Sequence, residues 1–334
     1  MIFRELENTI REFKMLQDND RVVVAVSGGA DSVFLTYALK RLQKRQRLYL
    51  HLAHLNHLLR KNEAGEDAFF VRSLAGRLKL SFSAAEIDVR EFARKHGLSI
   101  EEAARKARYD FLLRVARANV CSKVALGHNQ DDQAETVLMR FLRGSGLAGL
   151  RGIPPTRRIE GCLIIRPLIR LWRSDIEGFL KKKCICFRTD SSNSGTLFFR
   201  NRIRNLLLPE LMQDFNPKIK HILINFAQGL NEDFDFLNRQ SEDKFRSVCI
   251  RSAGPKIKLN IKKFRTLHKA MQRLILRRAI KELKGNLRRI DYRHWQELDQ
   301  LTYNRPKNSI VDLPAQISVL KQGDKLIFYN RIGK

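Results

Sequence analysis

A stretch of small residues follows a run of valines near the start of the chain. Residues 22–26 read VVVAV, and the small residues that come directly after them are Ser27, Gly28, Gly29, Ala30, Asp31 and Ser32. Residues 33–40 then have the composition and spacing of a helix. A strand, a small-residue turn and a helix together point backbone N–H groups at an anion. The sequence therefore predicts a phosphate-binding turn, in preference to a plain turn in which Asp31 caps the helix.

The residue types in this turn suit a phosphate. Gly28 and Gly29 remove Cβ atoms where a phosphate must approach the main chain, and Ser27 and Ser32 add hydroxyl donors. Asp31 fits beside a phosphate only when a cation lies between them, which predicts a bound Mg²⁺. The turn has neither the GxxxxGK nor the GxGxxG pattern, so two established phosphate loops are excluded.

A second polar motif occupies residues 127–136, GHNQDDQAET, after a predicted strand and at the start of a predicted helix. Its position predicts that it faces the same crevice as the turn. Acids complement a helix dipole, and this explains one or two of Asp131, Asp132 and Glu135. It does not explain three acids together with His128 in a strongly basic chain. The motif predicts Mg²⁺ binding, with Asp132 joining Asp31, or the capture of an amine.

Arginines in two further stretches suit a nucleotide or an RNA phosphate. Arg105 and Arg108 lie on a helix predicted to begin after Ser99. On spacing alone, an ion pair with a neighbouring Glu explains Arg105 equally well. The polar residues 190–193, followed by RNRIR with Arg200 and Arg204, are typical of a second anion site.

Two histidines end the second predicted strand, in residues 54–60, HLNHLLR. His57 could line the same pocket as the turn. Both histidines could instead be satisfied structural side chains, and this is the preferred interpretation for His54.

The charge of the chain is strongly positive. The 334 residues include 64 Lys and Arg against 35 Asp and Glu, a net charge of +29. Such an excess indicates a polyanionic partner, nucleic acid before a membrane surface. In the C-terminal part a basic stripe repeats every four residues, at Lys269, Arg273, Arg277 and Lys281. A solvated helix face has the same pattern, but the absence of interleaved acids favours contact with a phosphate backbone.

Five cysteines are scattered along the chain without a CxxC pair. An odd, scattered set indicates reduced thiols and a cytoplasmic protein, and it offers neither a zinc knuckle nor a cluster-binding pair. Residues 2–17 have the spacing of an amphipathic helix with acids, so we expect neither a signal peptide nor a membrane span there. The sequence leaves monomer and homodimer open.

The predicted elements alternate between strand and helix in the first part of the chain. Strands at 22–26, 48–55, 81–86 and 121–126 predict an α/β fold, a doubly wound and mainly parallel sheet. Pro209 and Pro217 bracket a boundary, which predicts domains of residues 1–212 and 217–334. The second, smaller domain is expected to be basic and mainly helical up to about residue 302. Short strands then close the chain.

These motifs resemble those of a known enzyme family. SGGADS is similar to the pyrophosphate loop of the ATP pyrophosphatases. Together with LNHLLR, EEAARKARY, GHNQDDQAET, RFLRGSGLAGL, DSSN and RNRIR it resembles the tRNA(Ile)-lysidine synthetases over about residues 20–212, and the tail resembles them more loosely. The resemblance implies an adenine nucleotide alpha hydrolase-like fold. It also implies ATP-dependent adenylation of the C2 carbonyl oxygen of the wobble cytidine in tRNA(Ile) with a CAU anticodon. The amine of L-lysine then displaces AMP to give lysidine, and the tRNA reads AUA instead of AUG.

The resemblance also implies roles for individual residues. Residues 27–32 would hold the pyrophosphate and Mg²⁺, and Asp132, Glu135 and His128 would place lysine and the metal. Arg108 and Arg204 would contact the nucleotide or the cytidine. Arg105, Arg200 and the C-terminal stripe would bind tRNA. From the chain length we expect the additional C-terminal domain of longer members to be absent.

Three alternatives use the same turn. An amidating enzyme like GMP synthetase or NAD synthetase would act on a small substrate and would not need a basic tail. A tRNA thiolase of the same superfamily also adenylates a base carbonyl, but the kind with an iron–sulfur cluster needs a CxxC pair. A non-catalytic RNA-binding protein with a decayed loop would have no reason to keep Asp31, Asp132 and Glu135 beside the loop serines.

Overall fold

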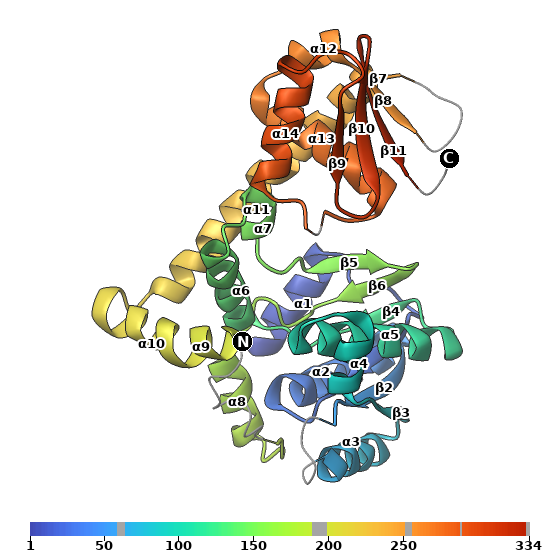
Figure 1. Ribbon diagram of the computed structural model, residues 1–334. Helices are drawn as coiled ribbons and strands as arrows, with labels where there is room; N and C mark the ends of the chain where they lie inside the picture. Colours follow the sequence, from blue (N-terminus) through green and yellow to red (C-terminus); the bar gives the residue numbers. More distant parts are fainter. Residues whose placement is uncertain (59–63, 189–198, 251–255, 288, 332–334) are drawn as a thin grey trace. The chain divides into compact units, whose positions relative to one another are not determined.

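The computed structural model describes residues 1–58, 64–188, 199–250, 256–287 and 289–331 (Figure 1). The chain divides into two compact units, Met1–Leu230 and Asn231–Lys334, and the division falls within helix α11 (Ile219–Val248). The domain bounds 1–212 and 217–334 remain a proposal beside this division.

The first unit contains a six-stranded sheet with the strand order β3-β2-β1-β4-β6-β5. All neighbouring pairs are parallel except β5 and β6. The expected doubly wound, mainly parallel sheet is therefore confirmed. The strands are β1 (Arg21–Ala25), β2 (Tyr49–Asn56), β3 (Ser81–Glu86), β4 (Lys123–Ala125), β5 (Thr156–Ile159) and β6 (Cys162–Ile165).

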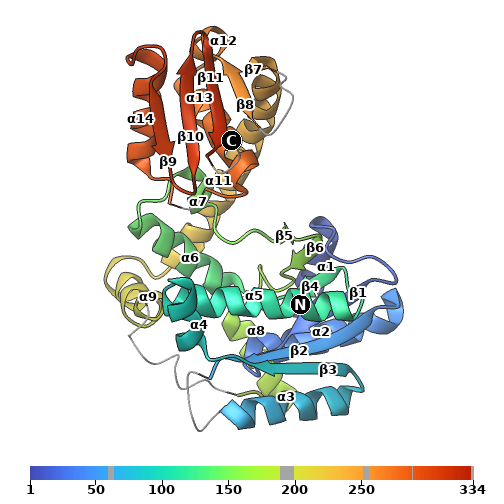
Figure 2. The same ribbon diagram turned by 45° about the vertical axis from the view of Figure 1, so that its right-hand side comes forward.

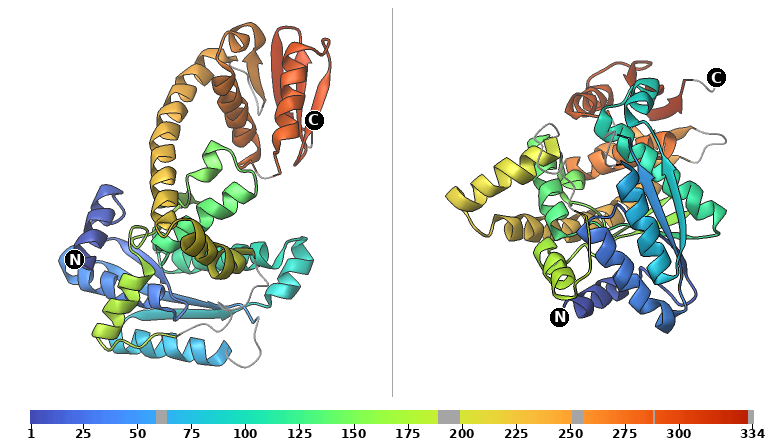
Figure 3. Two further views of the ribbon diagram at one scale, coloured as in Figure 1. Left: turned by 90° about the vertical axis from the view of Figure 1, so that its left-hand side faces the viewer. Right: turned by 90° about the horizontal axis from the view of Figure 1, so that it is seen from below.

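Helices cover both faces of this sheet (Figures 2 and 3). Val22 and Val24 pack in a core with side chains of α1, α2, α3 and α8, whereas Val23 packs in a second core with α5. Because β1 is buried on both faces, its sequence is a continuous apolar run. The helices are α1 (Ile2–Glu12), α2 (Ala30–Gln46), α3 (Ala64–Leu78), α4 (Val89–His96), α5 (Ile100–Ala118), α6 (Gln130–Leu142), α7 (Leu147–Leu150) and α8 (Arg173–Lys182).

Within the described residues of the first unit, four short helical segments follow α8. Two of them, η2 and η3, are π-helical, with hydrogen bonds that span five residues instead of four. In chain order the segments are α9 (Phe199–Arg202), η2 (Ile203–Leu207), α10 (Leu208–Glu210) and η3 (Leu211–Phe215).

The strand order reverses between β1 and β4. From β1 the chain adds β2 and β3 on one side of the sheet, and β4 and β6 then add on the other side. Val24 of β1 pairs with Ala125 of β4, so the two strands end level and their loops begin side by side. In open α/β sheets ligands bind beyond the carboxyl ends of the strands at such a switch point.

The second unit is built on an antiparallel five-stranded sheet with the order β7-β8-β11-β10-β9. Its core packs side chains of α13 and α14 against β10 and β11. The expectation of helix up to residue 302 was wrong for β7 and β8, which are short, and β8 also has a lysine, Lys258, between its apolar residues. The strands are β7 (Cys249–Ile250), β8 (Ile257–Asn260), β9 (Ile310–Leu313), β10 (Ile317–Gln322) and β11 (Lys325–Asn330); the helices are α12 (Ile261–Arg265), α13 (Lys269–Lys284) and α14 (Tyr292–Tyr303).

Within the described residues, no helix combines the length and the apolar character needed to cross a lipid bilayer.

Candidate active site

The turn after β1 is shaped from inside by its two serines. The Ser32 hydroxyl donates to the Gly29 carbonyl (2.9 Å) and accepts from the Ser27 backbone N–H (3.2 Å). Gly28 has φ +93°, a left-handed conformation that favours glycine. Gly29 is the N-cap of α2, and no described side chain caps that helix. The first N–H groups of α2 therefore remain for an anion.

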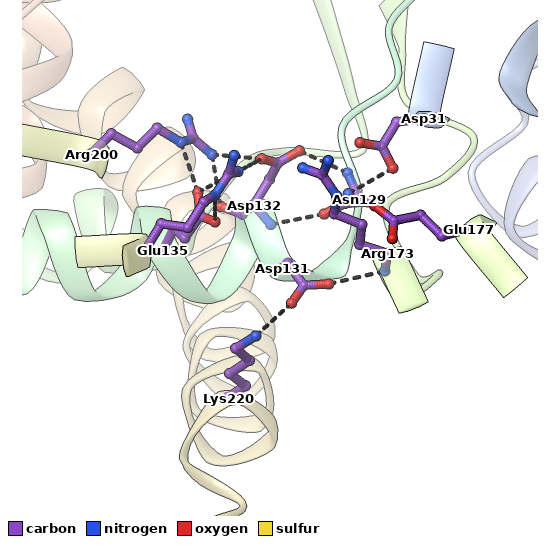
Figure 4. Close-up of polar contacts among 10 residues, drawn as sticks. Asp31, Asn129, Asp131, Asp132, Glu135, Arg173, Glu177, Arg200 and Lys220 are labelled. Carbon is purple, nitrogen blue, oxygen red and sulfur yellow. Dashed lines mark hydrogen bonds and ion pairs between the residues drawn. The ribbon is translucent and has the colours of Figure 1, made fainter. Parts of the chain in front are cut away.

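The turn after β4 is closed by its own side chains. The Asn129 side chain accepts from the Asp132 backbone N–H (2.9 Å), and the Asp132 carboxylate accepts from the Asn129 N–H (3.0 Å), which makes a reciprocal cap on α6. The Asn129 amide also donates to Asp31 (2.9 Å), so it joins the two helix starts (Figure 4). A Cβ on Gly127 would lie 3.3 Å from backbone atoms of Asp31 and Ser32, so glycine permits this close approach.

Two carboxylates of α6 and two guanidinium groups from α9 and η2 form a cluster, which we call the charge cluster: Asp132, Glu135, Arg200 and Arg204. Asp132 Oδ1 accepts from Arg200 (2.9 Å) and Arg204 (3.2 Å). Glu135 is only 2% exposed and accepts from Arg200 Nε (2.8 Å) and from an Arg204 amino group (3.0 Å). The acids and the arginines thus neutralise one another, and they join α6 to α9 and η2.

A pocket of about 260 Å³ lies beside the charge cluster, and Arg173 and Arg204 form part of its lining. The Asp131 carboxylate accepts there from Lys220 Nζ (2.7 Å) and from the Arg173 backbone N–H (3.0 Å). Glu135 and Leu208 complete its lining. The pocket therefore offers both signs of charge within a small volume.

A larger cleft of about 460 Å³ lies between the two turns. Most of the residues predicted from the sequence line it: Ser27, Gly29, Ala30, Asp31, Ser32, Arg105, Arg108, His128, Asp132, Arg200 and Arg204. Gly28 and Glu135 are not among its lining residues. Sequence reasoning missed Arg173 and Arg188, which also line the cleft but lie in stretches without a motif.

Asp31 is a half-buried carboxylate, and its hydrogen-bond partner among the described residues is the Asn129 amide and not a cation. Burial raises the pKa of Asp31 to about 6 and the nearby Asp132 charge adds to this, while the hydrogen bond from Asn129 opposes it. Such a pKa fits a carboxylate that is completed by a cation. Among the described residues no three or more His, Cys, Asp and Glu side chains gather as a metal site. A Mg²⁺ held at Asp31 and Asp132 would take its remaining ligands from phosphate and water, as this ion commonly does.

Two polar atoms in the cleft wall are buried without a hydrogen-bond partner among the described residues: Arg108 Nε and His57 Nδ1. Burial lowers the pKa of Arg108. Burial and the Arg108 charge lower the pKa of His57 to about 4, so its ring is neutral at pH 7. His54 instead faces Val26, with Nδ1 2.8 Å from the carbonyl oxygen, which is the structural role expected for it.

Arg166 is a further buried charge, and it lies outside every motif that the sequence offers. It follows β6, is 1% exposed, and donates through Nε to His128 Nδ1 (3.3 Å). Burial, followed by the charges of Arg108 and Arg166, lowers the pKa of His128 well below its ordinary value.

None of the five cysteines lines the cleft. Cys121 precedes β4 and Cys162 begins β6, so both lie at the amino ends of the strands, opposite the cleft. The cleft therefore lacks the thiolates that an iron–sulfur cluster requires.

The predicted basic stripe lies on α13 in the second unit. Lys269 Nζ is 3.8 Å from Asp299 Oδ1 and lies over the ring of Tyr303, and half-buried Arg277 lies over the ring of Trp295. Arg273 and Lys281 are exposed. The stripe is thus partly packed on aromatic rings and partly open to solvent.

Known protein families match residues in both units. A family model described as a PP-loop domain matches residues 2–211, and one described as a TilS substrate binding domain matches residues 259–324. The chain is similar in fold to the U34-tRNA thiolase NcsA from Methanococcus maripaludis, with a TM-score of 0.56 and 19% identity over 69% of this chain and 79% of that one.

Relatives of known name align along nearly the whole chain. The tRNA(Ile)-lysidine synthase of Clostridioides difficile (strain 630) is 36% identical over 99% of this chain and 71% of its own length. The tRNA(Ile)-lysidine synthase of Geobacter sulfurreducens is 38% identical over 96% of this chain and 67% of its own length. With the PP-loop model spanning more than half of the residues, the chain belongs to the tRNA(Ile)-lysidine synthase family.

Proposed function

We propose that this protein uses ATP to join L-lysine to C2 of the wobble cytidine of tRNA(Ile) with a CAU anticodon. The cytidine is first adenylated at its C2 oxygen, and the lysine amine then displaces AMP to form lysidine. The observation that supports this most is the cleft in which the uncapped start of α2 meets the charge cluster. One side suits a triphosphate, and the other suits an amino acid.

ATP fits the side of the cleft formed by the turn after β1. The start of α2 and the Ser27 hydroxyl would face its phosphates. Apolar side chains, among them Val26, Leu55 and Leu112, line the same cleft and suit the flat face of a base. Adenylation requires the α-phosphate to meet the cytidine oxygen, and Arg108 Nε is a buried donor without a partner in the described structure that can meet this phosphate.

Asp31 and Asp132 would hold Mg²⁺. When bound, the ion neutralises charge on the pyrophosphate as it leaves. Asp31 suits this because its described hydrogen-bond partner is an amide and not a cation.

Lysine carries both signs of charge and therefore fits the smaller pocket. Its carboxylate would face Lys220 and Arg173, and its ammonium group would face Asp131 and Glu135. Arg173 and Arg204 line both the pocket and the cleft, so lysine in the pocket would lie next to an adenylate in the cleft.

The tRNA must present one base out of the stack, which an anticodon loop permits at low energetic cost. Arg105 is exposed at the cleft and would contact the loop.

The stripe on α13 would contact the phosphate backbone elsewhere on the tRNA. Its four residues replaced together by Ala should weaken tRNA binding and flatten its dependence on salt. The matched control replaces four exposed basic residues of α1 and α2 or next to α2: Arg4, Arg11, Lys44 and Arg47. If tRNA affinity depended on salt concentration equally in the two variants, the stripe would be a solvated helix face and not a tRNA contact.

The reaction itself is tested by incubating the protein with ATP, labelled lysine and tRNA(Ile) with a CAU anticodon. Lysine label in the tRNA, together with AMP and pyrophosphate, is the expected result. The matched control is the same tRNA with uridine at the wobble position, which should take up no label. Incorporation of sulfur or ammonia instead of lysine would reject the proposal.

A further inference from the structure

Arg166 has one of the largest fully buried side chains in the described structure. Its guanidinium group is held on three sides. One amino group donates to the Pro154 carbonyl (2.7 Å), the other donates to the Tyr109 hydroxyl (3.3 Å), and Nε donates to His128 Nδ1 (3.3 Å). A group held in this way has little freedom to turn away from His128.

The third of these contacts fixes where His128 carries its proton. A guanidinium group donates hydrogen bonds and accepts none, so Nδ1 of His128 must present a lone pair. The ring is neutral at pH 7, because burial and the neighbouring arginines hold the pKa of His128 well below 6.5. A neutral imidazole with a bare Nδ1 carries its proton on Nε2. Towards a ligand in the cleft, His128 can therefore only donate.

We propose that Arg166 is a positioning residue that holds His128 as a neutral Nε2–H donor to an oxygen of the reacting phosphate. This rests on the proposed function. A donor of this kind neither accepts a hydrogen bond from the lysine ammonium group nor takes up its proton. It stabilises an oxygen whose negative charge grows as the adenylate forms, and its own proton stays on Nε2 throughout. His128 thus acts on the ATP side of the reaction and not on the lysine side.

Substitutions at His128 distinguish a donor from a base. His128→Gln keeps an N–H group at a similar reach, His128→Met keeps the size without a donor, and His128→Glu offers an acceptor. We expect Gln to retain adenylation of the tRNA within about tenfold of wild type. Met and Glu should lower kcat by about a hundredfold, the usual effect of losing one such donor, with KM for ATP changed little. Greater activity in the Glu variant than in the Gln variant would overturn the proposal.

The role of Arg166 is tested by combining variants. Arg166→Met should lower kcat by about tenfold in the wild-type protein, but hardly further in the His128→Met protein, because its effect passes through that ring. Losses that multiply fully in the double variant would mean that Arg166 acts by another route. Tyr109→Phe removes one of the three acceptors and is a milder variant in case Arg166→Met fails to fold. It should show a smaller loss that also vanishes beside His128→Met.

The proton position can be read directly by NMR on protein labelled with ¹⁵N-histidine. The His128 signals are assigned by their loss in His128→Met. We expect a pure Nε2–H tautomer in the wild-type protein and a mixture of tautomers in Arg166→Met. An unchanged pure tautomer in the variant, or an Nδ1–H form in the wild-type protein, would refute the inference. This measurement needs neither tRNA nor lysine, so its outcome is independent of whether lysidine forms.

Discussion

Two helix starts face each other across the cleft, and they are built in opposite ways. The helices α2 and α6 both follow a parallel strand that ends at the switch point of the sheet. The α2 start has glycine at its N-cap and no side-chain cap. The α6 start has Asn129 at its N-cap, a reciprocal cap from Asp132, and carboxylates in its first turn.

This difference in capping gives the two helix starts different roles in a ligase. An uncapped helix start is an unfilled anion site, whereas a capped start with its own acids is already filled. The same strand–turn–helix unit thus gives a place for a triphosphate on one side and a fixed set of carboxylates on the other. Substitutions at the α2 start should therefore affect mainly ATP binding, and substitutions at the α6 start should affect mainly stability.

Giving α2 a cap of its own should have the largest effect. Gly29→Asp would place a carboxylate where the phosphates bind, and we expect ATP to bind about a thousandfold more weakly, or about 4 kcal/mol. The free energy of unfolding should change by less than about 1 kcal/mol, since Asp is a good N-cap. ATP titration by calorimetry and urea unfolding measure the two quantities. Gly29→Ala is the control: its Cβ meets Ser27 Oγ at an ordinary 3.6 Å, and it adds no charge. Equal ATP affinities in the two variants would contradict the anion site.

Removing a charge from the α6 side should lower stability. Glu135→Gln leaves Arg200 and Arg204 with Asp132 as their remaining acidic partner, and breaking a buried ion pair in this way typically costs about 3 kcal/mol of unfolding free energy. Urea unfolding at pH 7 measures the loss. Glu177→Gln removes an acid from a partly exposed pair with Arg173 on α8 and should cost less than about 1 kcal/mol. A loss at Glu135 as small as that at Glu177 would show that the charge cluster is not a structural tie.

Asp31 should make the free protein less stable as the pH rises. Its folded-state pKa of about 6 exceeds the ordinary 3.8, so the folded protein holds this proton more tightly than the unfolded chain does. Stability is therefore lost between about pH 4 and pH 6, and the penalty is complete above pH 6. Asp31→Asn should raise the free energy of unfolding by about 3 kcal/mol at pH 7.5, and by well under about 1 kcal/mol at pH 4. The measurement is urea unfolding without metal or ATP.

Asp131→Asn is the contrasting variant for this test. It removes a charge that is paired with Lys220, so it should destabilise the protein at pH 7.5. A loss of stability in Asp31→Asn at that pH would contradict the description of Asp31 as an uncompensated acid.

Cutting the link between the two helix starts should have the smallest effect. Asn129→Ser keeps a capping oxygen for α6 but removes the amide that donates to Asp31, at a cost of about 1 kcal/mol. That hydrogen bond lowers the pKa of Asp31, so its loss should raise this pKa. As the pH falls, Asp31 should then become protonated, and Mg²⁺-ATP binding should weaken, at a higher pH than in the wild-type protein. Asn129→Ala loses the cap as well and should be less stable by about 1 kcal/mol more. An unchanged pH midpoint in Asn129→Ser would mean that the link does not tune Asp31.

The sequence predicted those parts of the site whose structure is local. The turn at residues 27–32 and the start of α6 are set by neighbouring residues: glycine for a positive φ, serines that bond within the turn, and acids at a helix start. The alternation of apolar strands and amphipathic helices was enough to predict the parallel sheet.

The arginines could not be read in the same way. Arg200 meets Glu135 across 65 residues of chain, and Arg166 meets His128 across 38. A charged residue looks alike in sequence whether it faces solvent, RNA or a buried acid, and only the fold decides between them. The strand β5 was missed for a related reason: TRRI lacks apolar alternation, and its pairing with β6 places it at the edge of the sheet.

The π-helical turn at η2 has a consequence for how this part of the chain can vary in length. Steps of four residues drift by about 40° around an α-helix, and a wider turn offsets that drift. Arg200, Arg204 and Leu208 follow one another at such steps, and all three pack toward residues of α6. Loss of a single residue from η2 would rotate α10 by about 100° relative to α9 and separate the arginines from their apolar anchor. Insertions and deletions in this stretch should therefore be far rarer in evolution than substitutions.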